Sequence, residues 1–99
     1  MKLENEKINN RRMYSAYYCP ALDKYVLNLI VTWAVWYPTY YEITEEEYNS
    51  FDTPEFDKFA RELYDIGSKS DRFLYSDMAA MNTEASYKFI EKYGYFKFE

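Results

Sequence analysis

The feature that most constrains the fold of this chain is an apolar run at residues 25–37, with the sequence YVLNLIVTWAVWY. Only Asn28 and Thr32 interrupt it with polar side chains, and Pro38 follows it directly. A helix needs about 20 apolar residues to cross a bilayer, so this run is too short to span a membrane. We therefore expect it to form the centre of the core, on which the rest of the chain packs.

The composition of this run favours a β-strand that is covered on both faces. β-branched and aromatic side chains suit a pleated sheet, and near-continuous hydrophobicity is typical of strands buried on both sides. A buried helix is the alternative, because Asn28, Thr32 and Trp36 recur at every fourth position. The side chains that favour the strand are those of Tyr25, Val26, Ile30, Val31, Thr32, Trp33, Val35, Trp36 and Tyr37.

A length of 99 residues corresponds to one domain of ordinary size. Two glycines and three prolines argue against an interdomain linker, and the single cysteine, Cys19, excludes an internal disulfide framework. Residues 1–10 are polar and lack the apolar stretch of a targeting signal. We therefore predict a flexible or frayed segment over residues 1–10, a single domain over residues 11–99, and a cytoplasmic location.

The tyrosine content predicts a ring-rich core and a partly aromatic surface. The chain has 13 tyrosines, and aromatic residues make up 22% of it. A buried tyrosine hydroxyl needs a hydrogen-bond partner, so burying all of these side chains completely is difficult. We expect several tyrosines to be half exposed.

Local signals predict alternating strands and helices. Residues 11–18 favour a strand, the connection 20–24 has the length of a hairpin loop, and residues 39–43 favour a further strand. Thr44 and Glu47 form a capping box that opens a short helix. Thr53, with Pro54 behind it, begins a second helix that ends before Gly67.

The C-terminal third completes an α+β fold. Residues 72–75 favour a short strand, residues 77–81 a helical turn, and residues 95–98 an edge strand. Thr83 is expected to cap a helix over residues 84–93. Together these elements predict an antiparallel sheet of about four or five strands, with two or three helices packed mainly on one face.

Several classes of chemistry lack the residues that they need. The chain has no histidine, which is the commonest general base and zinc ligand, and its two glycines cannot form a phosphate-binding or nucleophile-elbow motif. Asp52, Glu55 and Asp57 have loop-like spacing but lack the glycine of a calcium loop. We therefore predict a protein without enzymatic activity, cofactor or metal.

The charge distribution points to a basic partner. Residues 42–65 contain nine carboxylates against only Lys58 and Arg61, within a chain of net charge -5. Such a run creates a local anionic field that attracts cations. Arg11 and Arg12 precede several tyrosines, a pattern that can stack nucleic-acid bases, but the net acidity opposes phosphate binding. We therefore expect neither nucleic-acid nor membrane binding.

One segment resembles a known class of proteins. In an acidic, tyrosine-rich chain of this length, the sequence YYEI at residues 40–43 runs directly into TEEEY at residues 44–48. This combination resembles the small immunity proteins that bacteria encode beside polymorphic toxins, including those of contact-dependent growth inhibition. The resemblance implies a protein that binds one cognate toxin domain, often a nuclease, and blocks its active site or substrate groove.

The predicted binding surface follows from the acidic run. Glu47 is expected to be occupied by the capping box, and a homodimer formed through a tyrosine-rich face is the alternative function. The candidate partner-binding residues are Glu45, Glu46, Tyr48, Asp52, Glu55 and Asp57, and those of a second candidate surface are Asp71, Tyr75 and Asp77.

Overall fold

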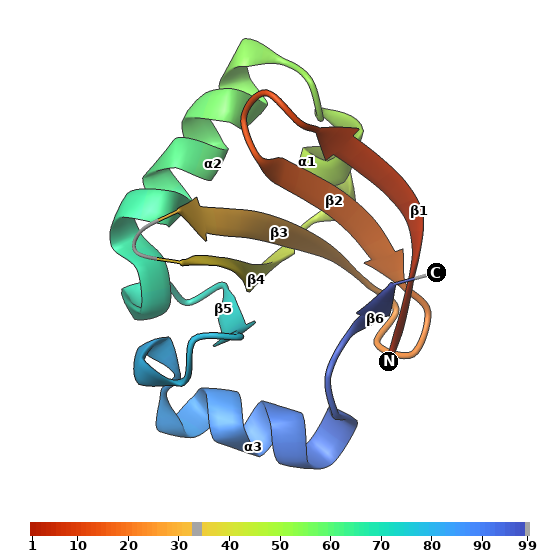
Figure 1. The fold of residues 1–99 in the computed structure, drawn as a ribbon. Coiled ribbons are helices and arrows are strands. Elements are labelled where there is room, and N and C mark those ends of the chain that lie inside the picture. Colours follow the sequence, from red (N-terminus) through yellow and green to blue (C-terminus); the bar gives the residue numbers. More distant parts are fainter. Residues whose placement is uncertain (33–34, 99) are drawn as a thin grey trace.

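The structure is a computed structural model that describes residues 1–32 and 35–98. These residues form an α+β fold, as predicted, in which a six-stranded sheet has the order β5-β4-β3-β2-β1-β6 (Figure 1). Neighbouring strands are antiparallel except for β1 and β6, which are parallel. The strands are β1 (Lys2–Asn9), β2 (Tyr14–Cys19), β3 (Lys24–Thr32), β4 (Trp36–Ile43), β5 (Phe73–Ser76) and β6 (Lys97–Phe98). The helices are α1 (Glu45–Asn49), α2 (Pro54–Ile66) and α3 (Glu84–Tyr93), with short 3₁₀ turns at Gly67–Lys69 and Ala79–Met81.

Strand β3 lies between β2 and β4 and is buried on both faces. Four consecutive residues, Val26 to Leu29, are at most 5% exposed. This confirms the strand and excludes the helix for residues 24–32. The expectation that one strand continues through residue 37 is wrong, because Trp36 already belongs to β4 and pairs with Thr32. The continuous hydrophobicity of residues 25–37 indicates burial, but it does not show where one strand ends and the next begins. The sequence between Thr32 and Trp36 has no glycine or asparagine that would signal a turn. Residues 33–34 lie outside the described residues.

The prediction of a flexible or frayed segment over residues 1–10 is wrong. Residues 2–9 form β1, which pairs with β2 from Glu4 opposite Tyr18 to Asn9 opposite Tyr14. A bulge with Asn5 at φ 54° interrupts the alternation of β1, which hides the strand in the sequence. Leu3 is 1% exposed and holds the strand in the core. The pairing with β6 brings the two chain ends together (Figure 1).

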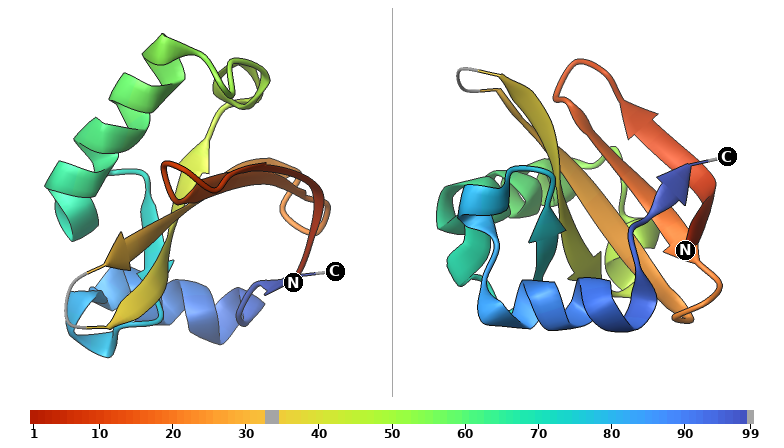
Figure 2. Two further views of the ribbon diagram at one scale, coloured as in Figure 1. Left: turned by 45° about the horizontal axis from the view of Figure 1, so that its top comes forward. Right: turned by 60° about the horizontal axis from the view of Figure 1, so that its bottom comes forward.

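Helices cover both faces of the sheet. Helices α1 and α2 lie on one face, and α3 lies across the other (Figure 2). On the first face, Leu27 and Tyr41 pack with Phe56, Ala60 and Leu63 of α2. On the second face, Val26, Tyr40 and Tyr75 pack with Phe89 and Ile90 of α3. Alternate residues of β3 and β4 thus belong to two separate cores. Of the three helices, α1 and α2 share one face, as expected for helices packed mainly on one face, and α3 lies on the other.

The predicted helix starts and stops are confirmed. The Thr53 hydroxyl accepts a hydrogen bond from the Phe56 N–H at 3.1 Å and caps α2, and the Thr83 hydroxyl accepts one from the Ser86 N–H at 3.2 Å and caps α3. Gly67 and Gly94 end these helices with positive φ, a conformation that glycine adopts without strain. The longest helix in the described ranges, α2, has 13 residues, and no helix there is long and apolar enough to cross a membrane.

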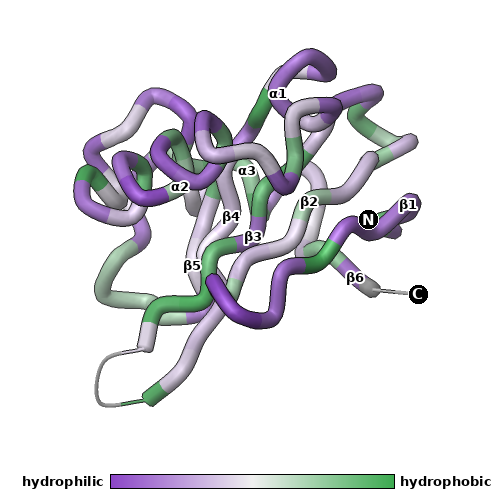
Figure 3. Tube along the Cα trace, turned by 90° about the horizontal axis from the view of Figure 1, so that it is seen from above, coloured by the Kyte–Doolittle hydropathy of each residue, from purple (hydrophilic) through white to green (hydrophobic). Residues whose placement is uncertain are grey.

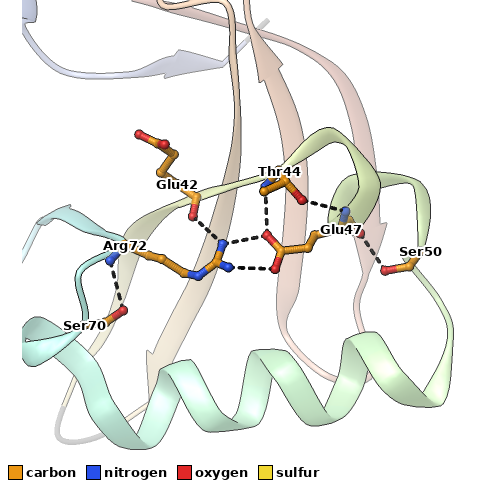
Figure 4. Close-up of polar contacts among 6 residues, drawn as sticks. All are labelled: Glu42, Thr44, Glu47, Ser50, Ser70 and Arg72. Carbon is orange, nitrogen blue, oxygen red and sulfur yellow. Dashed lines mark hydrogen bonds and ion pairs between the residues drawn. The ribbon is translucent and has the colours of Figure 1, made fainter.

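An arginine clamp joins the capping box to strand β5. The Arg72 guanidinium donates two hydrogen bonds to the Glu47 carboxylate, at 2.6 and 2.8 Å, and a third to the Glu42 carbonyl at 3.3 Å (Figure 4). Its charged group also lies 4.9 Å from the centre of the Phe59 ring of α2. Two parallel N–H···O bonds fix orientation as well as distance. Arg72 therefore ties α1, α2, β4 and β5 to one another.

We predict that Arg72→Gln destabilises the protein by about 1–3 kcal/mol, the range for loss of hydrogen bonds to a charged partner. The substitution leaves the half-buried Glu47 carboxylate without its cation. Urea unfolding followed by circular dichroism measures the change. Lys88→Gln is the control, because the pair of Lys88 with Glu84 is exposed at the surface and such pairs contribute only about 0.3–0.5 kcal/mol. Equal losses in the two variants would contradict the role assigned to the clamp.

Buried tyrosines predict unfolding at alkaline pH. Burial raises the pKa of Tyr41 and Tyr75 from 10.0 to about 12. The folded state therefore keeps phenolic protons that the unfolded state releases above pH 10, so this stabilisation is complete below pH 10 and is lost between pH 10 and about 12. We expect tyrosinate absorbance to rise together with loss of the circular dichroism signal. Ionisation of all 13 tyrosines with the secondary structure intact would refute this coupling.

Candidate functional site

Two consecutive helix starts place the predicted acidic residues at one corner of the molecule. The Thr44 hydroxyl accepts a hydrogen bond from the Glu47 N–H at 3.1 Å, and the Glu47 carboxylate accepts one from the Thr44 N–H at 2.8 Å. This box directs the first turn of α1 outward. The chain then passes through Asp52, at φ 68°, into the cap of α2. We call the residues Glu45, Glu46, Asp52, Glu55 and Asp57 the acidic corner.

Four carboxylates of the acidic corner are exposed. The carboxylates of Glu46 and Glu55 make no hydrogen bond or ion pair with the described residues. Glu45 accepts a hydrogen bond from the Tyr25 hydroxyl at 3.2 Å, and Asp52 accepts one from the Asn9 amide at 3.5 Å. Both of those donors are neutral, so neither bond pairs the carboxylate with a cation. Figure 3 shows that the surrounding chain of α1 is largely hydrophilic.

Asp57 differs from the other members of the acidic corner. Its carboxylate lies 3.5 Å from the Arg12 Nε and 3.7 Å from the Arg61 guanidinium. It also accepts a hydrogen bond from the Tyr14 hydroxyl at 3.1 Å. Burial first, and then this bond to Asp57, raises the pKa of Tyr14 to about 12. The negative charge of Asp57 is therefore already compensated within the protein, which weakens its assignment as a partner contact.

Tyr48, predicted to be an interface anchor, is buried instead. It is 8% exposed, and its hydroxyl donates a hydrogen bond to the Asn5 carbonyl of the β1 bulge. The Lys7 ammonium lies 4.2 Å from the centre of its ring, and the Tyr25 ring is 4.6 Å away. Burial raises its pKa. Tyr48 supports α1 from beneath, because the single turn after the capping box must pack one side chain on the sheet.

The residues of the second predicted surface, Asp71, Tyr75 and Asp77, do not form a continuous surface. Tyr75 is 1% exposed, and its hydroxyl accepts a hydrogen bond from the Phe96 N–H at 2.7 Å. Tyr75 pairs with Tyr40 in the sheet and faces the core under α3, so its assignment to a surface is wrong. Asp71 and Asp77 are exposed but lie beyond opposite ends of β5. Burial raises the pKa of Asp77.

A hollow of about 460 Å³ lies beside Glu45. Tyr18 and Tyr25 border it, and each donates its hydroxyl hydrogen to a carboxylate, Tyr18 to Asp23 at 2.7 Å. The bond to Asp23 is the main reason that the pKa of Tyr18 rises to about 12. For Tyr25, burial and then the bond to Glu45 raise the pKa. These phenols stay neutral at ordinary pH and orient the carboxylates without cancelling their charge.

The structure also brings two cations to the acidic corner. A hollow of about 280 Å³ is bordered by Arg11 and Arg12 of the β1–β2 turn and by Asp52 and Asp57. The sequence gives no signal for this approach, because three strands, β2 to β4, and helix α1 separate the two segments along the chain. Asp57 is thus paired with cations, whereas no ion pair of Glu45, Glu46 or Glu55 is found in the described part of the chain.

The arrangement is suited to binding cations on a surface. Within the described ranges, no group of three or more aspartates, glutamates or cysteines is placed to hold a metal ion. The carboxylates instead point outward from two rigid helix starts.

Comparison of the chain with family models, with curated proteins and with solved structures gives no match.

Proposed function

We propose that this protein is an immunity-type inhibitor that acts in the cytoplasm and neutralises a basic toxin domain by stoichiometric binding. The observation that carries this proposal is the exposure of uncompensated carboxylates at Glu45, Glu46 and Glu55 on two capped helix starts. The resemblance of residues 40–48 to immunity proteins supports the class of partner. The absence of histidine favours binding over catalysis.

Rigid presentation makes these charges effective. The capping box, the Arg72 clamp and the buried Tyr48 fix the backbone of α1, so little conformational entropy is lost when a partner binds. Exposed charges of one sign also accelerate encounter with an oppositely charged partner. A nuclease holds lysine and arginine where it binds phosphate, so carboxylates at the corner can occupy the phosphate positions.

A homodimer is the second candidate, because aromatic side chains are exposed around α3. Tyr87 is 54% exposed, Tyr93 39% and Tyr95 59%. Helix α3, which carries Tyr87 and Tyr93, lies on the face of the sheet opposite α1 and α2 (Figure 2). Burial of such side chains depends little on salt, so a dimer formed here should persist at high ionic strength in sedimentation experiments.

We predict that reversing two charges at the acidic corner weakens partner binding. The tagged protein is used to recover its partner from native cells, and the purified partner is assayed for nuclease activity with and without inhibitor. Glu46→Lys combined with Glu55→Lys should bind at least about tenfold more weakly, because each lysine faces a cation of the partner and about 1.4 kcal/mol is a factor of ten.

The matched control is Glu84→Lys combined with Glu91→Lys on α3. It changes the net charge by the same amount, and Glu84, like Glu46 and Glu55, lies in the first turn of a helix. This variant should bind and inhibit as the unmodified protein does. Equal loss of affinity in both variants would show that net charge alone matters, and no loss in either would exclude the acidic corner.

We also predict that salt slows formation of the complex. At about 0.15 M ionic strength the Debye length is about 8 Å, so higher salt removes long-range attraction between exposed charges. The association rate, measured by stopped flow with the recovered partner, should fall several-fold as salt rises, while the dissociation rate changes little. An association rate independent of salt would contradict electrostatic steering.

A further inference from the structure

The face of the sheet that carries α3 is only partly covered by it. The register sets Ile8, Ser15, Asn28, Tyr40 and Tyr75 side by side across five strands. Helix α3 and Phe96 cover the end with Tyr40 and Tyr75. The other end is hollowed by about 300 Å³ between β1, β2 and β3, and we call this hollow the Asn28 pocket. Figure 2 shows α3 lying across the sheet away from the β1–β2 turn.

Asn28 is an unusual residue for the centre of this sheet. It is 5% exposed, yet its Oδ1 atom has no hydrogen-bond partner in the described part of the chain. A buried polar atom without a partner destabilises the folded protein, and an apolar side chain of similar size avoids this cost. The Tyr17 hydroxyl, which also borders the hollow, donates to the Glu6 carboxylate at 2.6 Å. A group that enters the hollow and donates a hydrogen bond to this atom would remove the cost.

The lining of the pocket defines the chemistry of its occupant. Ile8 and Ile30 provide apolar walls, and no lysine or arginine lines the hollow. The Asn28 Oδ1 is the acceptor that lacks a partner, and the Glu6 carboxylate lies beside the lining, bound to Tyr17. The lining also carries the polar side chains of Asn9, Asn10 and Ser15. An aliphatic stem that ends in several N–H donors and a positive charge matches the apolar walls, the Asn28 Oδ1 and the Glu6 carboxylate. Arginine fits better than lysine because its guanidinium is more weakly hydrated and so is easier to bury.

Strand β4 extends the same face with exposed apolar side chains. Asn28 pairs with Tyr40, and alternation places Pro38 and Trp36 on the face of Tyr40. Trp36 is 70% exposed, and exposed tryptophan is typical of protein interfaces. A free amino acid would leave this strip uncovered, whereas a protein surface would bury it. We propose that the Asn28 pocket receives an arginine side chain of a partner protein, whose guanidinium donates a hydrogen bond to the Asn28 Oδ1 while the surrounding surface covers Trp36.

The test is an NMR titration of the full ¹⁵N-labelled protein with N-acetyl-arginine amide. The expected result is saturable shifts of the Asn28 side-chain amide and of the backbone amides of Ser15, Ile8 and Ile30. The matched probe is N-acetyl-citrulline amide, which has the same shape without the charge and should bind at least fivefold more weakly. Asn28→Leu should reduce arginine binding at least fivefold, whereas Tyr87→Phe on α3 should leave it unchanged.

Two results would overturn this proposal. One is the absence of saturable shifts around Asn28, and the other is equal binding of both probes. Shifts confined to Glu45, Glu46 and Glu55 would show that arginine binds only the acidic corner, which would also contradict the pocket. The inference does not rest on the proposed function, because the two sites lie on opposite faces and the titration reports on each separately. If Asn28→Leu does not fold, the proposal is still tested on the unmodified protein. The residues whose NMR signals shift, and the difference in affinity between the arginine and citrulline probes, then decide it.

Discussion

Burial of strand β3 on both faces is the constraint on which the rest of the structure depends. Val26 and Leu27 are both 0% exposed although they point to opposite sides of the sheet. A two-sided strand needs a layer of side chains above and below it, which only the remaining chain can provide. Helices α1 and α2 form one layer, and α3 with the C-terminal segment forms the other. A chain of this length thus builds two small cores around one strand.

The sequence predicted those elements whose signals are local. The caps at Thr44, Thr53 and Thr83 and the helix ends at Gly67 and Gly94 are correct because each depends on residues within one turn. Strand β1 and the reversal before Trp36 were missed because they depend on distant partners. Nothing within residues 1–10 indicates the bulge at Asn5, and no turn motif precedes β4.

The candidate site, like the fold, was predictable only where the signal is local in the sequence. Composition located the acidic run, and the capping box correctly separated Glu47 from its exposed neighbours. The positions of Tyr48, Asp57 and Tyr75 were not predictable, because they depend on tertiary contacts. Tyr48 packs beneath α1 against the β1 bulge, Asp57 pairs with Arg12, and Tyr75 is buried under α3. Carboxylates within reach of Lys24, Arg12 and Arg72 are used to hold the fold together. Those beyond the reach of any such cation are the ones that remain available for a partner.

The two proposed sites differ in how their polar groups relate to stability. At the acidic corner, carboxylates sit at helix N-termini, where the helix dipole favours negative charge, so the fold and the binding surface favour the same residues. At the Asn28 pocket the two requirements conflict, because the fold leaves the buried Asn28 Oδ1 without a hydrogen-bond partner, which costs stability. A buried polar atom without a partner needs an explanation, and the proposed arginine supplies one. The strand that organises both cores therefore also carries the polar atom that is hardest to explain without a partner.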